Sequence, residues 1–318
     1  MLQKTADWLT YELMLFAPGS ASGSAVSFFL YDSAKVLLLL LGISWLMGLL
    51  NAYLPVGHIR AFLAEHRLGG MQYLLAAAFG ALTPFCSCSS IPLFIGLVRG
   101  GIPVGVTLAF LITSPLVNEI AVAMFIGSFG GYITGLYVIS GILLGTLGGA
   151  LMARLHPETM LTEWARNSLS TKTPADRTPL SRPPDWRAVT AEALSIVRSV
   201  AAYIVIGIAV GALIHGYVPA DFFSGILCGA EQWSVPAGVL CGIPLYANAA
   251  GIVPILEVLV DKGVPMGTAL SFMMAVVGLS LPEAILLSKV MTRRLLVLYF
   301  GIVGGLIILS GYLFNLLT

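Results

Sequence analysis

The chain has 318 residues, of which 58% are hydrophobic and only 10% are charged, and its formal net charge is +1. Its mean hydropathy is +0.95. A soluble domain carries about 25% charged residues, so the composition argues against soluble enzymes and nucleic-acid-binding proteins. It indicates an integral membrane protein that crosses the lipid bilayer several times. Four cysteines are too few for a disulfide framework, and we expect no cofactor.

The N-terminal segment, residues 1–25, does not look like a cleavable signal peptide. It lacks the basic start and the continuous apolar stretch that such a peptide needs. Trp8, Leu9, Leu13 and Phe16 instead predict a short helix that lies at the membrane surface. We therefore take residues 1–25 as an N-terminal interfacial segment.

Eight apolar segments follow, each long enough to contribute to a membrane span, since about 20 apolar residues cross the hydrocarbon core. They lie at 26–50, 70–99, 103–128, 131–153, 189–214, 234–262, 265–290 and 294–316. Residues 154–187 differ, because they hold six arginines or lysines and several prolines. This composition predicts a flexible polar linker. The linker separates transmembrane repeat 1, residues 26–153, from transmembrane repeat 2, residues 188–318.

The two halves resemble each other when residue 80 is aligned with residue 242. The difference of 162 residues between these positions is called the repeat offset. Nine of 31 positions are identical, without a gap, between residues 80–110 and 242–272. Glycines and prolines are among the matches, for example Gly80 with Gly242 and Pro103 with Pro265. Further on, Glu119 matches Glu283 after a shift of two residues. These matches predict an internal repeat.

The distribution of arginine and lysine favours an inverted arrangement of the two repeats, because cytoplasmic loops are rich in these residues. If all eight segments cross the membrane, nine arginines and lysines lie on the linker's side and five lie on the opposite side. If 70–99 and 234–262 are re-entrant hairpins, the division is twelve against two. We therefore predict an all-α polytopic membrane protein with two inverted-topology repeats. Each repeat has about three full transmembrane helices and one re-entrant helix hairpin; eight continuous transmembrane helices are the alternative.

The first predicted hairpin contains the sequence Thr-Pro-Phe-Cys-Ser-Cys-Ser-Ser-Ile-Pro at residues 83–92. Its two prolines disfavour a continuous helix, so Cys86, Ser87 and Cys88 are expected on a helix break at membrane depth. Irregular backbone is tolerated there only where it is buried in protein or lines a polar cavity. In repeat 2 the same offset places Asn248 opposite Cys86. We take Cys86, Ser87, Cys88 and Asn248 as candidate substrate-binding residues.

Two neighbouring thiols suit a soft substrate. Thiolates select ions such as Cu(I) and Zn(II), so Cys86 and Cys88 are also the candidate metal ligands. Trivalent arsenic is soft as well. An arsenical with one organic substituent has two exchangeable valences, which two thiols would satisfy, whereas inorganic arsenite has three.

A second break is predicted in each repeat, at Ser-Pro-Leu-Val-Asn-Glu (114–119) and at Ser-Leu-Pro-Glu (280–283). We expect Pro115 and Pro282 to start new half-helices. An ionisable group at membrane depth is costly and usually functional, and burial favours the protonated form of a carboxyl group. Asn118 is therefore a candidate substrate-binding residue, and Glu119 and Glu283 are candidates for proton coupling.

The last spans of each repeat are rich in glycines at spacings that allow close helix packing. This packing can occur within one chain or between two copies, so a homodimer stays open. The sequence contains no Gly-X4-Gly-Lys-Ser/Thr, no His-Glu-X2-His and no Gly-X-Ser-X-Gly motif. We therefore expect a transporter and not an enzyme.

The Cys-Ser-Cys block, the following Gly-Gly-Ile-Pro-Val-Gly and the Thr-Ser-Pro-Leu-Val-Asn-Glu segment resemble the ArsP/YraQ-type predicted permease family. The resemblance covers most of both halves and excludes the linker. It implies a multi-pass permease of the prokaryotic inner membrane; some members are linked to efflux of trivalent organic arsenicals and others to copper or zinc efflux. Carried over by position, it implicates Cys86, Cys88, Asn118 and Glu119.

These observations predict a secondary transporter that exports a soft, thiol-reactive small molecule or metal ion, first of all a trivalent organoarsenical, with proton coupling and a cytoplasmic linker at 154–187. The alternatives are a copper or zinc efflux permease, a sulfur-compound permease, a passive channel, and a membrane thiol oxidoreductase. In the last of these, Cys86 and Cys88 would cycle between dithiol and disulfide.

Overall fold

The structure is a computed structural model that describes residues 2–17, 20–53, 70–82, 94, 96–98, 102–163, 165–166, 186–217, 233–245 and 249–318. These residues are almost all helical and contain no β-strand. The helices are α1 (Leu2–Asp7), η1 (Trp8–Leu13), α2 (Ala21–Tyr53), α4 (Met71–Leu82), α6 (Val104–Leu116), α7 (Glu119–Ala153), η2 (Pro157–Met160), α9 (Trp186–Tyr217), α11 (Ser234–Gly242), α12 (Ala249–Asp261), α13 (Met266–Gly278), α14 (Leu281–Leu287) and α15 (Arg293–Leu317).

Three stretches of the described chain are helical, long and apolar enough to cross a membrane: Ala121–Ala153, Met266–Leu287 and Arg293–Leu317. Some apolar helices are shorter. The helix α4 has 12 residues and α11 has nine, which correspond to lengths of roughly 18 Å and 14 Å at 1.5 Å per residue. Neither can cross a hydrocarbon core of about 30 Å by itself. The protein is therefore a multi-pass membrane protein that also contains helices of half the spanning length.

The N-terminal segment is helical, as the sequence predicts, and it is fixed to α2. The Ser27 hydroxyl donates a hydrogen bond of 2.6 Å to a carboxylate oxygen of Asp7 at the end of α1. Trp8 and Leu13 in η1 are exposed. This arrangement exposes apolar side chains on the surface of the segment, as a position at the membrane surface requires.

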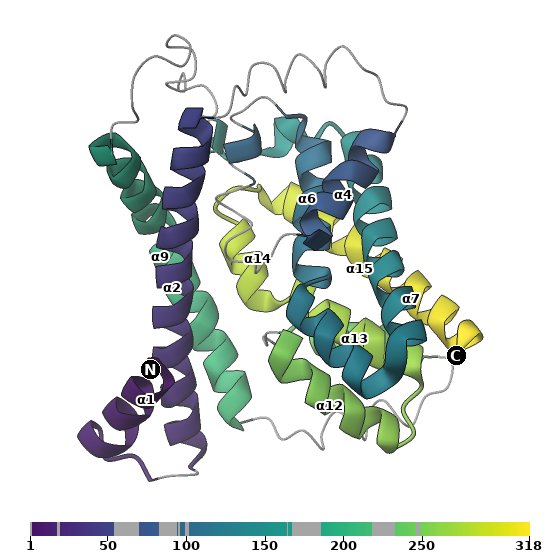
Figure 1. Cartoon of the computed structure of the whole chain (residues 1–318), viewed down its shortest axis with the longest axis horizontal. Coiled ribbons are helices and arrows are strands. Elements are labelled where there is room, and N and C mark those ends of the chain that lie inside the picture. Colours follow the sequence, from purple (N-terminus) through teal and green to yellow (C-terminus); the bar gives the residue numbers. More distant parts are fainter. Residues whose placement is uncertain are drawn as a thin grey trace.

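The helices α2 and α9 form a pair at one side of the molecule (Figure 1). They have 33 and 32 residues, so each is about 50 Å long. The rings of Trp45 and Trp186 stack with their centroids 5.7 Å apart, and the Trp45 indole N–H donates to the Thr190 hydroxyl at 3.2 Å. The helix α9 also contacts α14, which joins this pair to the remaining bundle.

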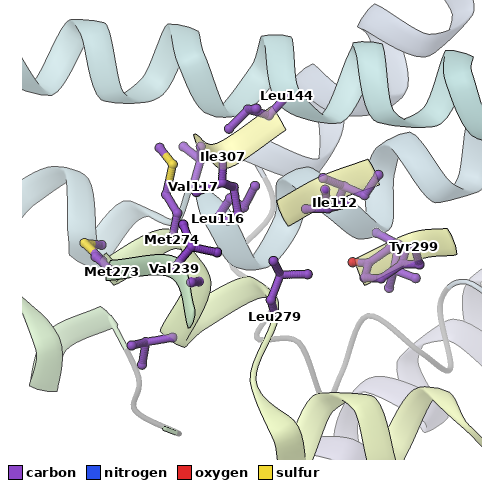
Figure 2. Packing of buried hydrophobic residues seen from close by; sticks show 14 of the residues in the cluster. Ile112, Leu116, Val117, Leu144, Val239, Met273, Met274, Leu279, Tyr299 and Ile307 are labelled. Carbon is purple, nitrogen blue, oxygen red and sulfur yellow. The ribbon is translucent and has the colours of Figure 1, made fainter. Parts of the chain in front are cut away.

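The bundle repeats one packing pattern. The helix α4 packs on α6 and α7, and α11 packs on α13 and α15. Contacts between α6 and α13 and between α7 and α15 join the two sets. Figure 2 shows Leu116, Val117, Leu279, Tyr299 and Ile307 within the buried cluster where these helices meet. The core thus lies between the two halves of the chain.

Glycines make the same close contacts in both halves. A Cβ atom on Gly80 would lie 2.9 Å from the Phe110 carbonyl oxygen, and one on Gly242 would lie 2.9 Å from that of Phe272. The repeat offset relates Gly80 to Gly242 and Phe110 to Phe272. The glycines are therefore needed because α4 approaches the backbone of α6, and α11 that of α13, too closely for any side chain.

These contacts lead to a stability prediction. We expect Gly80→Ala and Gly242→Ala each to destabilise the protein by about 1–3 kcal/mol, because a backbone carbonyl cannot move aside cheaply. Gly301→Ala is the matched control, since no atom lies within 4 Å of its added Cβ. The effect is measured by thermal unfolding of the purified protein in detergent. The loss of its monodisperse peak reports the unfolding. Unchanged unfolding temperatures for Gly80→Ala and Gly242→Ala would contradict this packing.

The last part of each half also matches. The helix α7 is interrupted at Gly130, whose φ of 78° and ψ of 169° are not helical. The repeat offset relates Gly130 to Thr292, which precedes α15 and has an extended ψ of 160°. The segment before Gly130 therefore corresponds to α14, and the segment after it corresponds to α15.

The start of the predicted linker is attached to repeat 2. Leu161 forms an antiparallel bridge with Met291. The Thr162 amide donates to the Val290 carbonyl oxygen at 3.0 Å, and the Thr292 amide donates to that of Met160 at 3.0 Å. The residues just after α7 thus lie beside the residues just before α15.

Candidate functional site

Part of the predicted site can be located. Cys86, Ser87, Cys88 and Asn248 lie outside the described residues. Glu119 is described by its backbone as the first residue of α7. Asn118 and Glu283 are described in full and mark the helix breaks of the two repeats. The two helix breaks are therefore the described part of the predicted site.

The break in repeat 1 separates α6 from α7. Val117 is extended, with φ −126° and ψ 111°, and the Asn118 side-chain oxygen accepts a hydrogen bond of 2.8 Å from the Ala121 amide. Asparagine is a favourable N-cap because it satisfies an amide that the helix leaves free. The prediction that Pro115 starts the new half-helix is wrong: Pro115 lies in the last turn of α6. Asn118, rather than proline, sets the start of α7.

The break in repeat 2 has the same form. Ser280 caps α14, and its hydroxyl oxygen accepts from the Glu283 amide at 3.4 Å. Pro282 is the second residue of α14, as the sequence predicts. The Leu281 amide donates to the Ile243 carbonyl oxygen at 2.7 Å, just past the end of α11. The freed backbone of the break is thus satisfied by the neighbouring helix.

The repeat offset continues through both breaks. It relates Asn118 to Ser280, and these two residues have the same capping role. Glu283 then corresponds to Ala121, and Glu119 is two positions earlier in its helix. The predicted match of Glu119 with Glu283 is therefore wrong at the structural level, because the caps keep the ungapped register. The two carboxyl groups do not occupy equivalent positions.

The two breaks lie together in the core. A Cβ atom on Gly278, the last residue of α13, would lie 2.7 Å from a side-chain methyl of Leu116, the last residue of α6. Leu116, Val117 and Leu279 belong to the same buried cluster (Figure 2). Ser280 and Glu283 are buried. The helix starts at Asn118 and Ser280 therefore bring two positive dipole ends and several polar side chains into an apolar core.

Glu283 stands out within this arrangement. It is 3% exposed and lies in the first turn of α14. A buried carboxyl group is expensive in an apolar region unless it is protonated or its charge is compensated. Glu283 therefore places a carboxyl group in the core, three residues after the Ser280 cap.

The sequence reasoning missed Glu257 in α12. The Ser128 hydroxyl, in the part of α7 before Gly130, donates a hydrogen bond to the Glu257 carboxylate. This contact joins repeat 1 to the second predicted hairpin. An ionisable residue within an otherwise apolar hairpin was the available signal, but its partner comes from the other half of the chain.

The described residues do not assemble a metal site. No group of three His, Cys, Asp or Glu side chains that could hold a metal ion occurs in the part of the chain that the structure describes. Cys241 in α11 is a free thiol and half-buried. The roles of Cys86 and Cys88 stay predictions, because both residues lie outside the described part of the chain.

Comparisons with known proteins identify relatives that match most of the chain. The chain is 21% identical to the UPF0718 protein MJ0584 of Methanocaldococcus jannaschii over an alignment of 337 positions, which covers 86% of this chain and 92% of that protein. It is 24% identical to the UPF0718 protein YraQ of Escherichia coli K12 over 270 positions, which covers 83% and 72%. No solved structure matches. The profile of the ArsP_1 family, described as predicted permease, matches residues 22–316, so the chain belongs to this permease family.

Proposed function

We propose that this permease is a secondary transporter that exports a soft, thiol-reactive solute, first of all a trivalent arsenical with one organic substituent. The observation that carries the proposal is the pair of helix breaks, related by the repeat offset and packed together in the core. Broken helices at the midplane are where repeat transporters place their substrates. The Cys-Ser-Cys motif in the preceding segment supplies the soft ligands.

The contact of the linker with repeat 2 supports the inverted arrangement. Residues 160–162 follow α7, residues 290–292 precede α15, and the two stretches are hydrogen-bonded to each other. The corresponding helices α7 and α15 therefore have opposite ends on the same side. Lys289, Arg293 and Arg294 then share the linker's side, which agrees with the re-entrant arrangement and disagrees with eight continuous crossings. With the positive-inside rule, this side is the cytoplasm of a prokaryotic inner membrane.

The proposed capture step is a ligand exchange. A monosubstituted arsenical carries two hydroxyl groups on trivalent arsenic. Each of Cys86 and Cys88 would replace one hydroxyl group, forming one arsenic–sulfur bond and releasing one water molecule, with no change in oxidation state. Two water molecules would reverse both exchanges and release the solute on the other side.

Proton coupling is assigned to Glu283, with Glu119 at the start of α7 as the second candidate. Glu283 is buried beside the helix breaks, so its change of charge would alter the stability of the packed core. Rocking of one repeat against the other would then expose the site alternately on the two sides. The export direction of this cycle is what the resemblance to efflux permeases implies.

A binding measurement tests the substrate class. Native mass spectrometry of the purified protein with trivalent methylarsenite should show one bound arsenical per chain, with loss of two water molecules. Dimethylarsenite, with one exchangeable valence, and inorganic arsenite, with three, are the matched comparisons and should bind more weakly. Cu(I) in a parallel titration tests the metal alternative. Binding of none of these solutes would contradict the proposal, and binding of Cu(I) alone would replace the arsenical by the metal.

A further inference from the structure

One polar contact joins the two repeats on the side of the protein opposite the linker, called the far side below. The Ser128 hydroxyl in α7 donates a hydrogen bond to the Glu257 carboxylate in α12. Ser128 lies just before the break at Gly130, and the helical segment 131–153, roughly 35 Å long, separates this break from the linker. Glu257 lies about one turn before Asp261, the last residue of α12. The contact is therefore about one membrane thickness away from the linker.

The two helical segments that this bond connects both begin at the candidate site. The segment 119–129 of α7 follows the cap at Asn118, and α12 begins directly after Asn248 in the sequence. The helix α12 packs on α13 of its own repeat and on α7 of the other. Each segment thus leads from the site region toward the far side, where Ser128 meets Glu257.

The segment that carries Ser128 has a joint at Gly130. The φ of 78° and ψ of 169° at this residue belong to a region that essentially only glycine adopts. The Thr134 hydroxyl donates to the Gly130 carbonyl oxygen at 2.8 Å, which satisfies an acceptor at the break. A hinge needs such a residue, because it absorbs a change of backbone angle while the helices on either side stay intact.

The bond between Ser128 and Glu257 is also one that can open cheaply. Ser128 is exposed and Glu257 is half-buried, so water can take the place of either partner. The hydrogen bond from the Tyr137 hydroxyl to the Leu116 carbonyl oxygen is different, because both residues are buried. Breaking that bond would leave buried polar groups unsatisfied, which costs free energy. The contact at Ser128 is therefore suited to be made and broken repeatedly.

The repeat does not place a polar pair at the related positions. The repeat offset relates Ser128 to Val290 and Glu257 to Ile95, and neither of these side chains can form a hydrogen bond. Resting on the alternating access proposed above, we infer that the hydrogen bond between Ser128 and Glu257 is a latch that holds the transport pathway closed on the far side. Its opening lets α12 and the segment 119–129 separate.

Cysteine labelling from each side of the membrane tests the latch without transport. The reporter is Val117→Cys, because Val117 is buried at the helix break. An impermeant maleimide is applied to right-side-out and to everted vesicles, and peptide mass spectrometry measures the label at residue 117. We expect Ser128→Ala to speed labelling from the far side by about tenfold, because loss of a hydrogen bond to a carboxylate shifts the population toward the open state. Glu158→Cys, exposed after α7, identifies the vesicles whose linker side faces the reagent.

Conservative variants and a double variant are the controls. Ser128→Thr keeps the hydroxyl and Glu257→Gln keeps an acceptor oxygen, so both should label like the reporter alone. Glu257→Ala should label faster from the far side, as Ser128→Ala does. If the two residues act through one bond, the double variant should label no faster than Glu257→Ala alone.

The outcomes separate the latch from the proposed function. An unchanged rate in Ser128→Ala, equal increases from both sides, or additive effects in the double variant would each overturn the latch. If residue 117 is labelled from neither side in any variant, alternating access through the breaks fails, and the latch fails with it. Faster labelling from the far side, together with no binding of methylarsenite or Cu(I), would support the latch and overturn the proposed substrate.

Discussion

Replacing both cysteines of the motif by serine, in Cys86→Ser/Cys88→Ser, is expected to reduce transport of trivalent methylarsenite to the background of vesicles without the protein. Serine hydroxyls are hard ligands and do not replace thiolates on a soft centre. The substitution changes size very little, so insertion and folding should be preserved. Uptake into everted membrane vesicles with an imposed proton gradient measures the effect, normalised to the amount of protein in the membrane.

The remaining two cysteines provide the control. Cys228→Ser/Cys241→Ser leaves the motif intact, and Cys241 lies half-buried in α11. This variant should transport like the wild type. Normal transport by Cys86→Ser/Cys88→Ser would overturn the capture role of the motif, whereas loss in both double variants would indicate a general effect of cysteine removal.

Glu283→Gln is expected to lower proton-driven accumulation by about tenfold or more, because glutamine keeps the size and polarity of the side chain but cannot release a proton. Exchange of labelled for unlabelled solute without a gradient should continue, because it needs no net proton movement. Both measurements use the same vesicles. This separation of coupled from uncoupled transport distinguishes a coupling residue from one needed for folding.

Glu257→Gln is the matched control for Glu283→Gln. Glu257 also lies in an apolar helix, but it accepts its hydrogen bond from Ser128 at the contact between α12 and α7. Accumulation by Glu257→Gln should stay close to that of the wild type. Equal accumulation by Glu283→Gln and the wild type at every pH would remove Glu283 from the coupling mechanism.

Much of the helical architecture could be predicted from the sequence, because long apolar segments and a glycine–proline repeat leave few choices in a membrane. The ranges 26–50, 189–214 and 294–316 correspond to α2, α9 and α15. The repeat offset reappears in the contacts of Gly80 with Phe110 and of Gly242 with Phe272. Glycine matches carry this information because they report a close approach of backbones.

The exact breaks could not be predicted in the same way. Proline predicts the start of a half-helix in both repeats, but the starts depend on the caps at Asn118 and Ser280. A cap is a local hydrogen bond that competes with other turns, so its position is weakly marked in an apolar sequence. The register error between Glu119 and Glu283 follows directly from this.

The partners of several polar groups were also beyond sequence reasoning. Tyr137 looks like an ordinary aromatic core residue, although its hydroxyl donates to the Leu116 carbonyl oxygen, and Glu257 meets Ser128 from the other half of the chain. Only tertiary packing decides which polar groups meet. The roles of Cys86, Cys88 and Asn248 stay predictions, since these residues lie outside the described part of the structure.

Gradient-driven transport by the purified wild-type protein in proteoliposomes tests the central claim most directly. The measurement is the internal concentration of trivalent methylarsenite, with and without a proton gradient, compared with the external concentration. We predict accumulation above the external concentration that collapses when an uncoupler is added. Equilibration without accumulation would contradict a proton-coupled transporter and indicate a passive channel, and absence of any movement would contradict the proposed substrate.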